Sequence, residues 1–226
     1  MPTVLVTGSN RGLGLEFARQ YAADGWRVIA CCRKPDGADD LKAVTGEVQI
    51  EAVELIDPAS IRDLAERLKG EAIDLLINNA GVLGPAQSFG DTDYSGFDTV
   101  MRSNVLGPMA MVEALLPNLE AGGIKTAVAI SSGWGSIGTV GSGGRYLYGP
   151  SKAALNMVVK AQSLDLRDKG VAAVAISPGW VETDMGGEGA DFTPEQSVGN
   201  MRALIAGLSL EDSGKFYSHK GHEIPW

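Results

Sequence analysis

Short apolar runs alternate with stretches of helical character along the chain, and this alternation limits the fold more than any other feature. Several of the runs, such as Leu75-Leu76-Ile77, are apolar throughout, as expected for strands that helices cover on both faces. We therefore predict an α/β fold, a single domain over residues 1–226 with a doubly wound parallel sheet of about seven strands and helices on both faces. Strands are expected at residues 4–7, 27–32, 48–55, 75–78, 126–131, 171–177 and 215–218. Helices are expected at residues 13–23, 59–68, 96–116, 151–168 and 194–207.

A glycine-rich turn follows the first predicted strand and opens the first predicted helix. Its sequence is Thr7-Gly8-Ser9-Asn10-Arg11-Gly12-Leu13-Gly14. Glycine lets the backbone approach a pyrophosphate, and the start of a helix supplies free N–H groups and the positive end of its dipole. A nucleoside triphosphate loop is not favoured, because no Gly-Lys-Ser/Thr follows. The turn predicts a dinucleotide site formed by residues 8–14, and the alternative is a merely structural tight turn.

Two basic residues, Arg33 and Lys34, follow the second predicted strand. Folds that bind NAD usually carry an acidic residue there, about twenty residues after the turn, on the ribose 2′-hydroxyl. Together with Arg11, these cations could instead bind a 2′-phosphate, since guanidinium groups pair well with phosphate oxygens. We therefore predict NADPH or NADP+ as the cofactor, with NADH less favoured. The alternative is two solvated charges in a loop.

The stretch Tyr148-Gly149-Pro150-Ser151-Lys152 is the candidate for acid–base chemistry. Residues four apart share one face of a helix, so the ammonium can lie beside the phenol, and Pro150 is tolerated in a first helical turn. Lowering a tyrosine pKa from about 10 to about 7 needs roughly 4 kcal/mol, which one cation at ~4 Å supplies in a sheltered site. Taken alone, the pair could equally be an exposed helix start.

The balance of charges limits the possible partners. With 19 basic and 28 acidic residues the formal net charge is −9, which argues against nucleic acid or an anionic membrane as the main partner. No apolar stretch approaches the roughly eighteen residues of a membrane span, and no basic leader precedes the first strand. We expect a soluble, cytoplasmic protein. Its cysteines, Cys31 and Cys32, are adjacent in a predicted strand and point to opposite faces, so we expect no disulfide between them.

Six motifs occur in an order that resembles the short-chain dehydrogenase/reductase family. They are Thr7-Gly8-x-x-x-Gly12-x-Gly14, Asn78-Asn79-Ala80-Gly81, Asn104, Ser131-Ser132, Tyr148-x-x-x-Lys152 and Pro178-Gly179. The finer pattern at residues 151–157 and 179–187 resembles the branch of C-factor-like proteins and sniffer-type carbonyl reductases. The resemblance covers essentially the whole chain and implies a single NAD(P)-binding Rossmann domain, with a short substrate loop near residues 183–197. It implies no metal site.

The resemblance implies roles for four residues in reducing a carbonyl. Tyr148 would donate its proton to the substrate oxygen, and Lys152 would lower the pKa of that tyrosine and hold the nicotinamide ribose. Ser132 would hydrogen-bond the same oxygen. Asn104 would hold a water or a backbone group behind Lys152. The alternative is that Asn104 is an ordinary polar residue of a helix.

Two other serines near Ser132 remain candidates for the bond to the substrate oxygen. Ser132 precedes Tyr148 by sixteen residues, a longer interval than in many family members, and Ser131 and Ser136 lie nearby. We favour Ser132 because the carbonyl reductase branch resembles this spacing.

The resemblance also implies further cofactor contacts. Asp57 would contact the adenine, although a helix cap ahead of Pro58 is an equally good interpretation. The remaining predicted contacts are Asn78, Ala80 and Gly81 on the ribose and pyrophosphate side, and Pro178, Gly179, Val181 and Thr183 at the nicotinamide.

The substrate pocket should be formed by residues 83–93, 133–145 and 180–194. Trp134, Trp180 and Phe192, with Phe89, would give it an apolar wall, unless these side chains simply fold onto the surface. We predict an NADPH-dependent oxidoreductase that reduces a small hydrophobic ketone, aldehyde or quinone. The alternative is a dinucleotide-binding signalling protein of the C-factor type with little or no turnover. By resemblance alone, a homodimer or homotetramer is expected.

Overall fold

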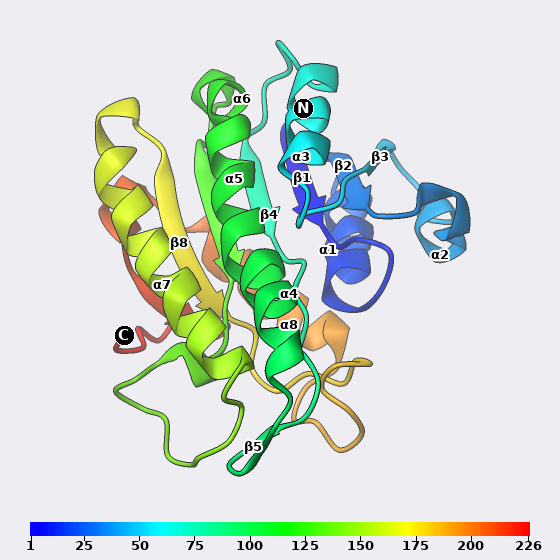
Figure 1. The fold of residues 1–226 in the computed structure, drawn as a ribbon. Coiled ribbons are helices and arrows are strands. Elements are labelled where there is room, and N and C mark those ends of the chain that lie inside the picture. The colour runs from blue at the N-terminus through cyan, green and yellow to red at the C-terminus, as the bar shows by residue number, and fades with distance from the viewer.

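Seven parallel strands form one sheet in the computed structural model, which describes residues 1–226 (Figure 1). Their order across the sheet is β3-β2-β1-β4-β7-β8-β9. The strands are β1 (Thr3–Thr7), β2 (Arg27–Cys32), β3 (Val48–Ala52), β4 (Leu75–Asn78), β7 (Thr126–Ile130), β8 (Ala172–Ser177) and β9 (Phe216–Ser218). The helices are α1 (Gly12–Ala23), α2 (Asp39–Lys42), α3 (Pro58–Arg67), α4 (Phe97–Met101), α5 (Gly107–Ala114), α6 (Leu116–Ala121), α7 (Tyr148–Asp165) and α8 (Pro194–Ala206). The predicted α/β fold with seven strands is confirmed.

Helices cover both faces of the sheet, and the side chains of each strand divide between two cores. Leu75 and Ile77 of β4 pack in the core under α1 and α8, whereas Leu76 packs in the core under α3, α5 and α6. In Figure 1, α5 and α7 lie in front of the sheet and α8 lies behind it. Burial on both faces explains why the strands are apolar throughout.

Helix α7 packs on alanine-rich parts of β7 and β8. Its Leu155 and Val159 contact a core that includes Ala129, Ala173 and Ala175. Small side chains on the sheet leave room for the helix to approach closely. This packing holds α7, which begins at Tyr148, against β7 and β8.

The predicted helix at residues 96–116 is interrupted. Its first part, α4, runs into a π-helical turn at Arg102–Leu106 before α5 continues from Gly107. A π-turn inserts an extra residue and re-aims the side chains within it. Here the turn contains Asn104, which is fully buried.

Other boundaries differ by a few residues. The third strand ends at Ala52 rather than at residue 55, and α7 begins at Tyr148 rather than at residue 151. A hairpin that was not predicted is formed by β5 (Gln87–Ser88) and β6 (Asp91–Thr92), which pair antiparallel with a turn at Gly90. In Figure 1 this hairpin projects beside the segments that follow β7 and β8.

The two cysteines are free and lie on opposite faces of β2, as expected. Cys31 packs in the core with α3 and α5, and Cys32 packs in the core with α1 and α8. Of the helices, none combines the length and the apolar character needed to cross a membrane.

Candidate active site

The sheet reverses its strand order between β1 and β4. From β1 the chain proceeds outward through β2 and β3, then returns to place β4 on the other side of β1. The carboxyl ends of strands at such a switch point form a crevice in which ligands bind in open α/β sheets. Here the crevice is bordered by the turn from Gly8 to Gly14 and by the segment Asn79-Ala80-Gly81.

Glycine is required at two positions of this turn. Gly8 has a φ of +69°, a left-handed conformation, and a Cβ there would lie 3.0 Å from Ala80. A Cβ on Gly14 would lie 2.1 Å from the carbonyl oxygen of Gly8, a distance that no side chain tolerates. The turn and the start of α1 can therefore pack this closely only without side chains.

The N-terminus of α1 keeps its first N–H groups available. No side chain caps it, and the residue before it, Arg11, has an exposed side chain. The first N–H groups of a helix have no partner within the helix, and together with the dipole they suit an anion. Asn10 is exposed and Leu13 is half-buried, whereas buried Ser9 donates inward to the carbonyl of Val6. The glycine cradle and the uncapped helix start fit a dinucleotide pyrophosphate.

Asn79 holds the turn in place, a role that was not predicted from its motif. Its Nδ2 donates to the carbonyls of Thr7, at 2.9 Å, and of Gly8, at 3.4 Å. Thr7 Oγ1 in turn accepts from the N–H groups of Asn79 and Ala80, both at 3.0 Å. These bonds tie the end of β1 to the end of β4. The doubled asparagine in Asn78-Asn79-Ala80-Gly81 was the available signal.

Exposed cations border the end of β2. Arg33 and Lys34 are both exposed and form no ion pair, so their charges are available to a ligand. Arg11 differs from the expectation, because its Nη1 lies 2.6 Å from Asp184 Oδ2 in an exposed ion pair. In this structure Arg11 therefore ties the glycine-rich turn to the loop after β8.

Two predicted contacts on the adenosine side, Asp57 and Asn78, make hydrogen bonds within the protein. Asp57 caps α3, with Oδ1 accepting from the Ala59 N–H at 2.9 Å, so the capping interpretation holds whether or not Asp57 also meets the adenine. Asn78 departs from the expectation: its side chain is buried and donates to the carbonyl of Pro108. That amide points toward α5, because Asn78 shares the strand face of Leu76.

Gly81 lies against the candidate catalytic residues. A Cβ on Gly81 would lie 3.2 Å from Asn104 Oδ1 and 3.5 Å from Lys152 Nζ. Ala80 packs on Gly8, at the other side of the crevice. The Asn79-Ala80-Gly81 segment thus joins the glycine-rich turn to the lysine.

The predicted nicotinamide residues lie where β8 ends. The carbonyl of Pro178 accepts from Ser197 at 2.7 Å, and Thr183 Oγ1 accepts from the Gly186 N–H at 3.1 Å. Thr183 also approaches the turn, since a Cβ on Gly12 would lie 3.6 Å from its methyl group. Val181 is buried, and Gly179 is exposed at a φ of +81°. The segment after β8 therefore covers the start of α1.

Tyr148 and Lys152 lie together in the first turn of α7. The Lys152 Nζ is 5.6 Å from the centre of the Tyr148 ring and donates to the Ile130 carbonyl at 2.8 Å. Burial lowers the pKa of Lys152 to about 8. Burial also raises the pKa of Tyr148, opposed by a hydrogen bond with Ser132 and by the charge of Arg145. This direction is opposite to the sequence expectation, because desolvation of the phenolate outweighs its neighbours.

The structure separates the three candidate serines. The Ser132 hydroxyl lies beside the Tyr148 phenol and also accepts from the Trp134 N–H at 3.3 Å. Ser131 is buried and donates to Asn156 Oδ1 at 2.6 Å, and Ser136 is buried and donates to the carbonyl of Pro225 at 2.6 Å. Only Ser132 therefore shares a site with the phenol.

Asn104 organises the space behind the lysine. Its Oδ1 accepts from the Val82 N–H at 2.8 Å, and its Nδ2 donates to the Val82 carbonyl at 2.9 Å and to Ser151 Oγ at 3.0 Å. A backbone group rather than a side chain is thus its main partner. The π-helical turn aims Asn104 across to α7, which links the segment after β4 to the catalytic helix.

The predicted apolar wall is only partly assembled. Trp134 is half-buried beside Ser132, whereas Trp180 is 51% exposed and its Nε1 donates to the carbonyl of Gly186. Phe192 packs edge-on against His219, with ring centres 4.5 Å apart. It therefore supports the base of the loop after β8. Phe89, at the tip of the hairpin, is 89% exposed.

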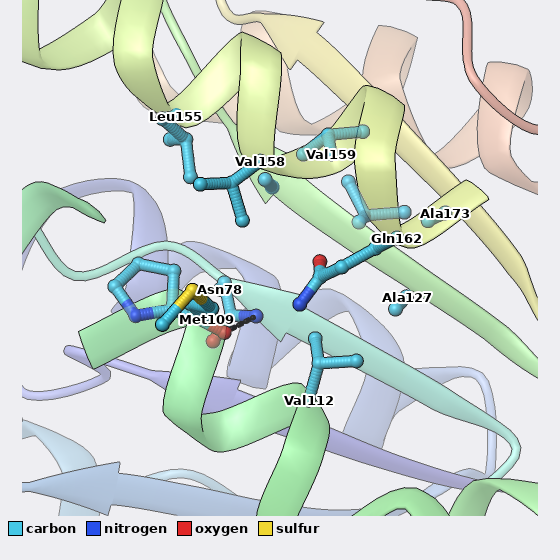
Figure 2. Close-up of a pocket in the computed structure, with 12 residues that line it drawn as sticks. Asn78, Met109, Val112, Ala127, Leu155, Val158, Val159, Gln162 and Ala173 are labelled. Atoms are coloured by element: carbon cyan, nitrogen blue, oxygen red, sulfur yellow. Dashed lines mark hydrogen bonds between the residues drawn. The ribbon is translucent and has the colours of Figure 1, made fainter. Parts of the chain in front are cut away.

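A small cavity under α7 is separate from this crevice. Figure 2 shows it between α5, α7 and the strands, with the side chains of Asn78 and Gln162 directed into it. Its volume is about 10 Å³, which is about the space of one water molecule. The cavity is too small for a substrate and holds none of the acid–base residues.

Known proteins resemble the chain over most or all of its length. A model of the family described as short chain dehydrogenase matches residues 2–192. The C-signal protein of Myxococcus xanthus is 44% identical over 154 residues, 68% of this chain and 93% of that protein. A 1-hydroxy-2-glutathionyl-2-methyl-3-butene dehydrogenase of a Rhodococcus strain is 36% identical over 232 residues, 100% of both chains.

Solved structures share the fold closely. The NADPH-bound carbonyl reductase from chicken fatty liver has a TM-score of 0.91 and is 37% identical, covering 100% of this chain and 99% of that chain. The carbonyl reductase Sniffer of D. melanogaster has a TM-score of 0.92 and is 28% identical, with 100% of both chains covered.

Proposed function

The chain belongs to the short chain dehydrogenase family, and we propose that it is an NADPH-dependent oxidoreductase that reduces a small hydrophobic ketone, aldehyde or quinone. One observation carries the proposal: the Ser132 hydroxyl and the Tyr148 phenol lie side by side, with the Lys152 ammonium behind the ring. This is a pair of hydrogen-bond donors for one substrate oxygen, supported by a buried cation. The reverse oxidation of an alcohol would use the same residues.

In our proposal the residues divide the work on the substrate oxygen. Ser132 holds that oxygen, and Tyr148 donates its proton as negative charge develops there. A raised pKa keeps the phenol protonated at neutral pH, which suits an acid in reduction. Lys152 stabilises the phenolate that remains, and Asn104 holds Val82 and Ser151 behind it. The nicotinamide, when bound, supplies the hydride.

The basic side chains support NADPH over NADH. Arg33 and Lys34 are exposed and unpaired at the end of β2, where a 2′-phosphate would be recognised. The chicken carbonyl reductase, similar over the full chain, was crystallised with NADPH. The residues proposed to hold the rest of the cofactor are the turn at residues 8–14, Asp57, Ala80 and Gly81, and Pro178, Gly179, Val181 and Thr183.

We further propose that the loop after β8 closes over the site. It leaves the sheet at a bridge between Val181 and Phe192, and Glu182 N–H donates to the Phe192 carbonyl at 2.9 Å. This pairing gives the loop a fixed base, and the exposed ion pair between Arg11 and Asp184 holds its far part against the glycine-rich turn. Helix α8 begins at Pro194, so the loop is shorter than the expected residues 183–197.

Exposed apolar side chains support the proposed homodimer or homotetramer. On α7, Met157 and Leu164 are each 67% exposed, and Leu106 beside α5 is 47% exposed. Apolar groups on one helical face favour association with another copy.

A second function is favoured by the 44% identity to C-signal. In that case the chain would bind a dinucleotide and act as a signalling protein with little turnover. The complete set of Asn104, Ser132, Tyr148 and Lys152 argues against it, since binding alone does not need a buried ammonium beside a phenol.

The test is turnover of a substrate panel. The purified protein with NADPH should consume reduced nicotinamide in the presence of aromatic ketones, isatin-like diones or quinones, and NADP+ should be tested with alcohols that carry a glutathionyl group. Tyr148→Phe should lower kcat at least ~1,000-fold. The variant should still bind NADPH, as followed by the change in fluorescence on binding. Binding without turnover of any substrate would favour the signalling alternative, and turnover in Tyr148→Phe would move the acid elsewhere.

A further inference from the structure

Three successive backbone N–H groups at the start of α7 donate to a single residue, Gln87. The Tyr146 N–H reaches its main-chain carbonyl at 3.3 Å. The Leu147 and Tyr148 N–H groups reach its side-chain Oε1 at 3.1 and 2.8 Å. The side chain of Gln87 thus bonds the backbone of the candidate acid directly, from a position 61 residues earlier in the chain.

The other end of the Gln87 amide is also occupied. Its Nε2 donates to the carbonyl of Leu83 at 2.8 Å and to that of Pro85 at 3.3 Å, and the residue is 7% exposed. Every donor and acceptor of the side chain is therefore used, half on α7 and half on the segment after β4. The bonds of Asn104 to Val82 and Ser151 join the same two parts at a second point.

Helix α7 depends on this contact for its N-terminus. No side chain from its own end caps it. The Gly149 N–H donates to Arg145 at 2.8 Å, and Pro150 has no N–H group. The remaining donors, those of Leu147 and Tyr148, have Gln87 as their partner, and an unpaired buried N–H is strongly unfavourable.

The backbone that leads into α7 is strained, which makes an external restraint necessary. Arg145 has a φ of 57°, the left-handed region that residues with a Cβ rarely adopt. Such a conformation persists only where the surroundings determine it. Gln87 accepts hydrogen bonds from the three residues that follow Arg145, and the Arg145 carbonyl accepts from the Gly149 N–H, so Gln87 holds this bend together with the first turn of α7.

Gln87 also begins the β5–β6 hairpin, which links the start of α7 to the rim of the site. The hairpin places Phe89 at its tip, with its ring 6.2 Å from that of Tyr146. Both rings are exposed, Phe89 by 89% and Tyr146 by 43%. An apolar substrate that covers Phe89 and Tyr146 would therefore rest on the two segments that Gln87 joins.

We propose that Gln87 is a positioning residue, which holds the backbone of the acid Tyr148 in place and couples it to the hairpin that meets an apolar substrate. This inference rests on the proposed function, because it assigns Tyr148 the acid role. Gln87 does not touch the reacting atoms. Its effect is transmitted through the N–H groups of Leu147 and Tyr148.

The test compares two changes at one position. Gln87→Leu removes both hydrogen-bonding ends, whereas Gln87→Glu keeps the acceptor for α7 and loses the donor to Leu83 and Pro85. Thr92→Val, on the same hairpin, removes a hydroxyl that bonds only Ser88 and serves as the matched control. Amide hydrogen exchange at Leu147 and Tyr148 is measured for all of them, with kcat and KM for a substrate of the wild-type protein.

We expect Gln87→Leu to lose exchange protection at Leu147 and Tyr148 and to lower kcat on the order of 10- to 100-fold, as small misplacements of catalytic groups do. The KM for NADPH should stay within about twofold. Gln87→Glu should keep that protection and recover most of the lost kcat, and Thr92→Val should match the wild type in both measurements.

The inference is overturned if protection at Leu147 and Tyr148 is unchanged in Gln87→Leu, or if Gln87→Glu loses as much kcat as Gln87→Leu. A wild-type protein without turnover would defeat the proposed function instead. The position of Tyr148 can then still be read by ultraviolet titration of its phenol, with Tyr148→Phe as the reference. An ionisation that moves to lower pH in Gln87→Leu supports the positioning role, and an unmoved ionisation contradicts it.

Discussion

Two helices, α1 and α7, begin at the same edge of the sheet and use their N-termini in opposite ways. The start of α1 has no side-chain cap and is lined by glycines, so its N–H groups are available to a ligand. At the start of α7 every N–H group has a partner within the protein, through Gln87 and Arg145. One helix start is therefore suited to receive an anion, whereas its neighbour fixes a side chain. Both depend on bonds to the segment after β4.

The glycines near the two helix starts should differ most in their effect on cofactor binding. Gly14→Ala places a Cβ 2.1 Å from the Gly8 carbonyl oxygen, whereas Gly149→Ala, near the start of α7, meets the Trp134 carbonyl oxygen at 3.3 Å. We expect Gly14→Ala to weaken NADPH binding at least ~100-fold, the equivalent of about 2.7 kcal/mol, and Gly149→Ala to bind NADPH nearly normally. Fluorescence titration with NADPH checks both variants. Equal binding by the two would contradict the proposed difference between the helix starts.

The next effect concerns the buried cation beside α7. Lys152→Met should lower carbonyl reduction by about 100-fold or more, since the phenolate loses its stabilising charge. Wild-type reduction should itself fall as the pH rises above about 8, where Lys152 loses its proton. Rates from pH 6 to pH 10 check this. A flat profile through pH 9 would remove the ammonium from the mechanism.

Replacing Lys152 by Met should also raise the free energy of unfolding. The folded protein releases the Lys152 proton near pH 8, against an ordinary pKa of 10.5, so the buried charge is unfavourable below pH 8 and stability rises from pH 8 toward 10.5. Lys152→Met is expected to gain about 2–3 kcal/mol at pH 7 and less at pH 9.5. Denaturant unfolding at both pH values measures the gain, and an equal gain at the two would contradict the assignment to this proton.

A smaller effect tests whether Arg33 recognises the 2′-phosphate of the cofactor. Arg33→Ala should weaken NADPH binding by roughly 10- to 100-fold, the loss of a charge-assisted phosphate contact, and leave NADH binding almost unchanged. Arg167→Ala, an exposed arginine near the opposite edge of the sheet, is the control. If NADPH and NADH binding weaken equally, Arg33 does not recognise the 2′-phosphate.

The smallest effect concerns the ion pair between the turn and the loop after β8. Asp184→Ala frees Arg11, and because exposed pairs contribute about 0.2–1 kcal/mol, NADPH affinity should rise by no more than about fivefold. Glu188→Ala, an unpaired carboxylate on the same loop, should change less. A weaker affinity in Asp184→Ala would mean that the closed loop contributes more than the free cation.

The sequence predicted the sheet and the glycine-rich turn after β1, because strands buried on both faces leave long apolar runs and the glycines of the turn have a direct steric reason. It did not predict the tertiary features that decide how the site works. The amide of Asn78 turns toward α5, and Gln87 bonds an amide 61 residues away; neither has a local pattern. The pKa of Tyr148 was expected to fall and is raised, since burial depends on the packed structure and not on the spacing to Lys152.

The neighbours Cys31 and Cys32 give the two faces of the sheet separate chemical reporters. One thiol is buried under α3 and α5 and the other under α1 and α8, and burial raises the pKa of both. A thiol reagent reacts with such a group only after the covering helices open. With one cysteine changed to serine at a time, labelling rates would report separately on the opening of the layer with α1 and α8 and of the layer with α3 and α5. The two thiols would thus show whether the helices on the face that carries the glycine-rich turn open before or after the helices on the other face.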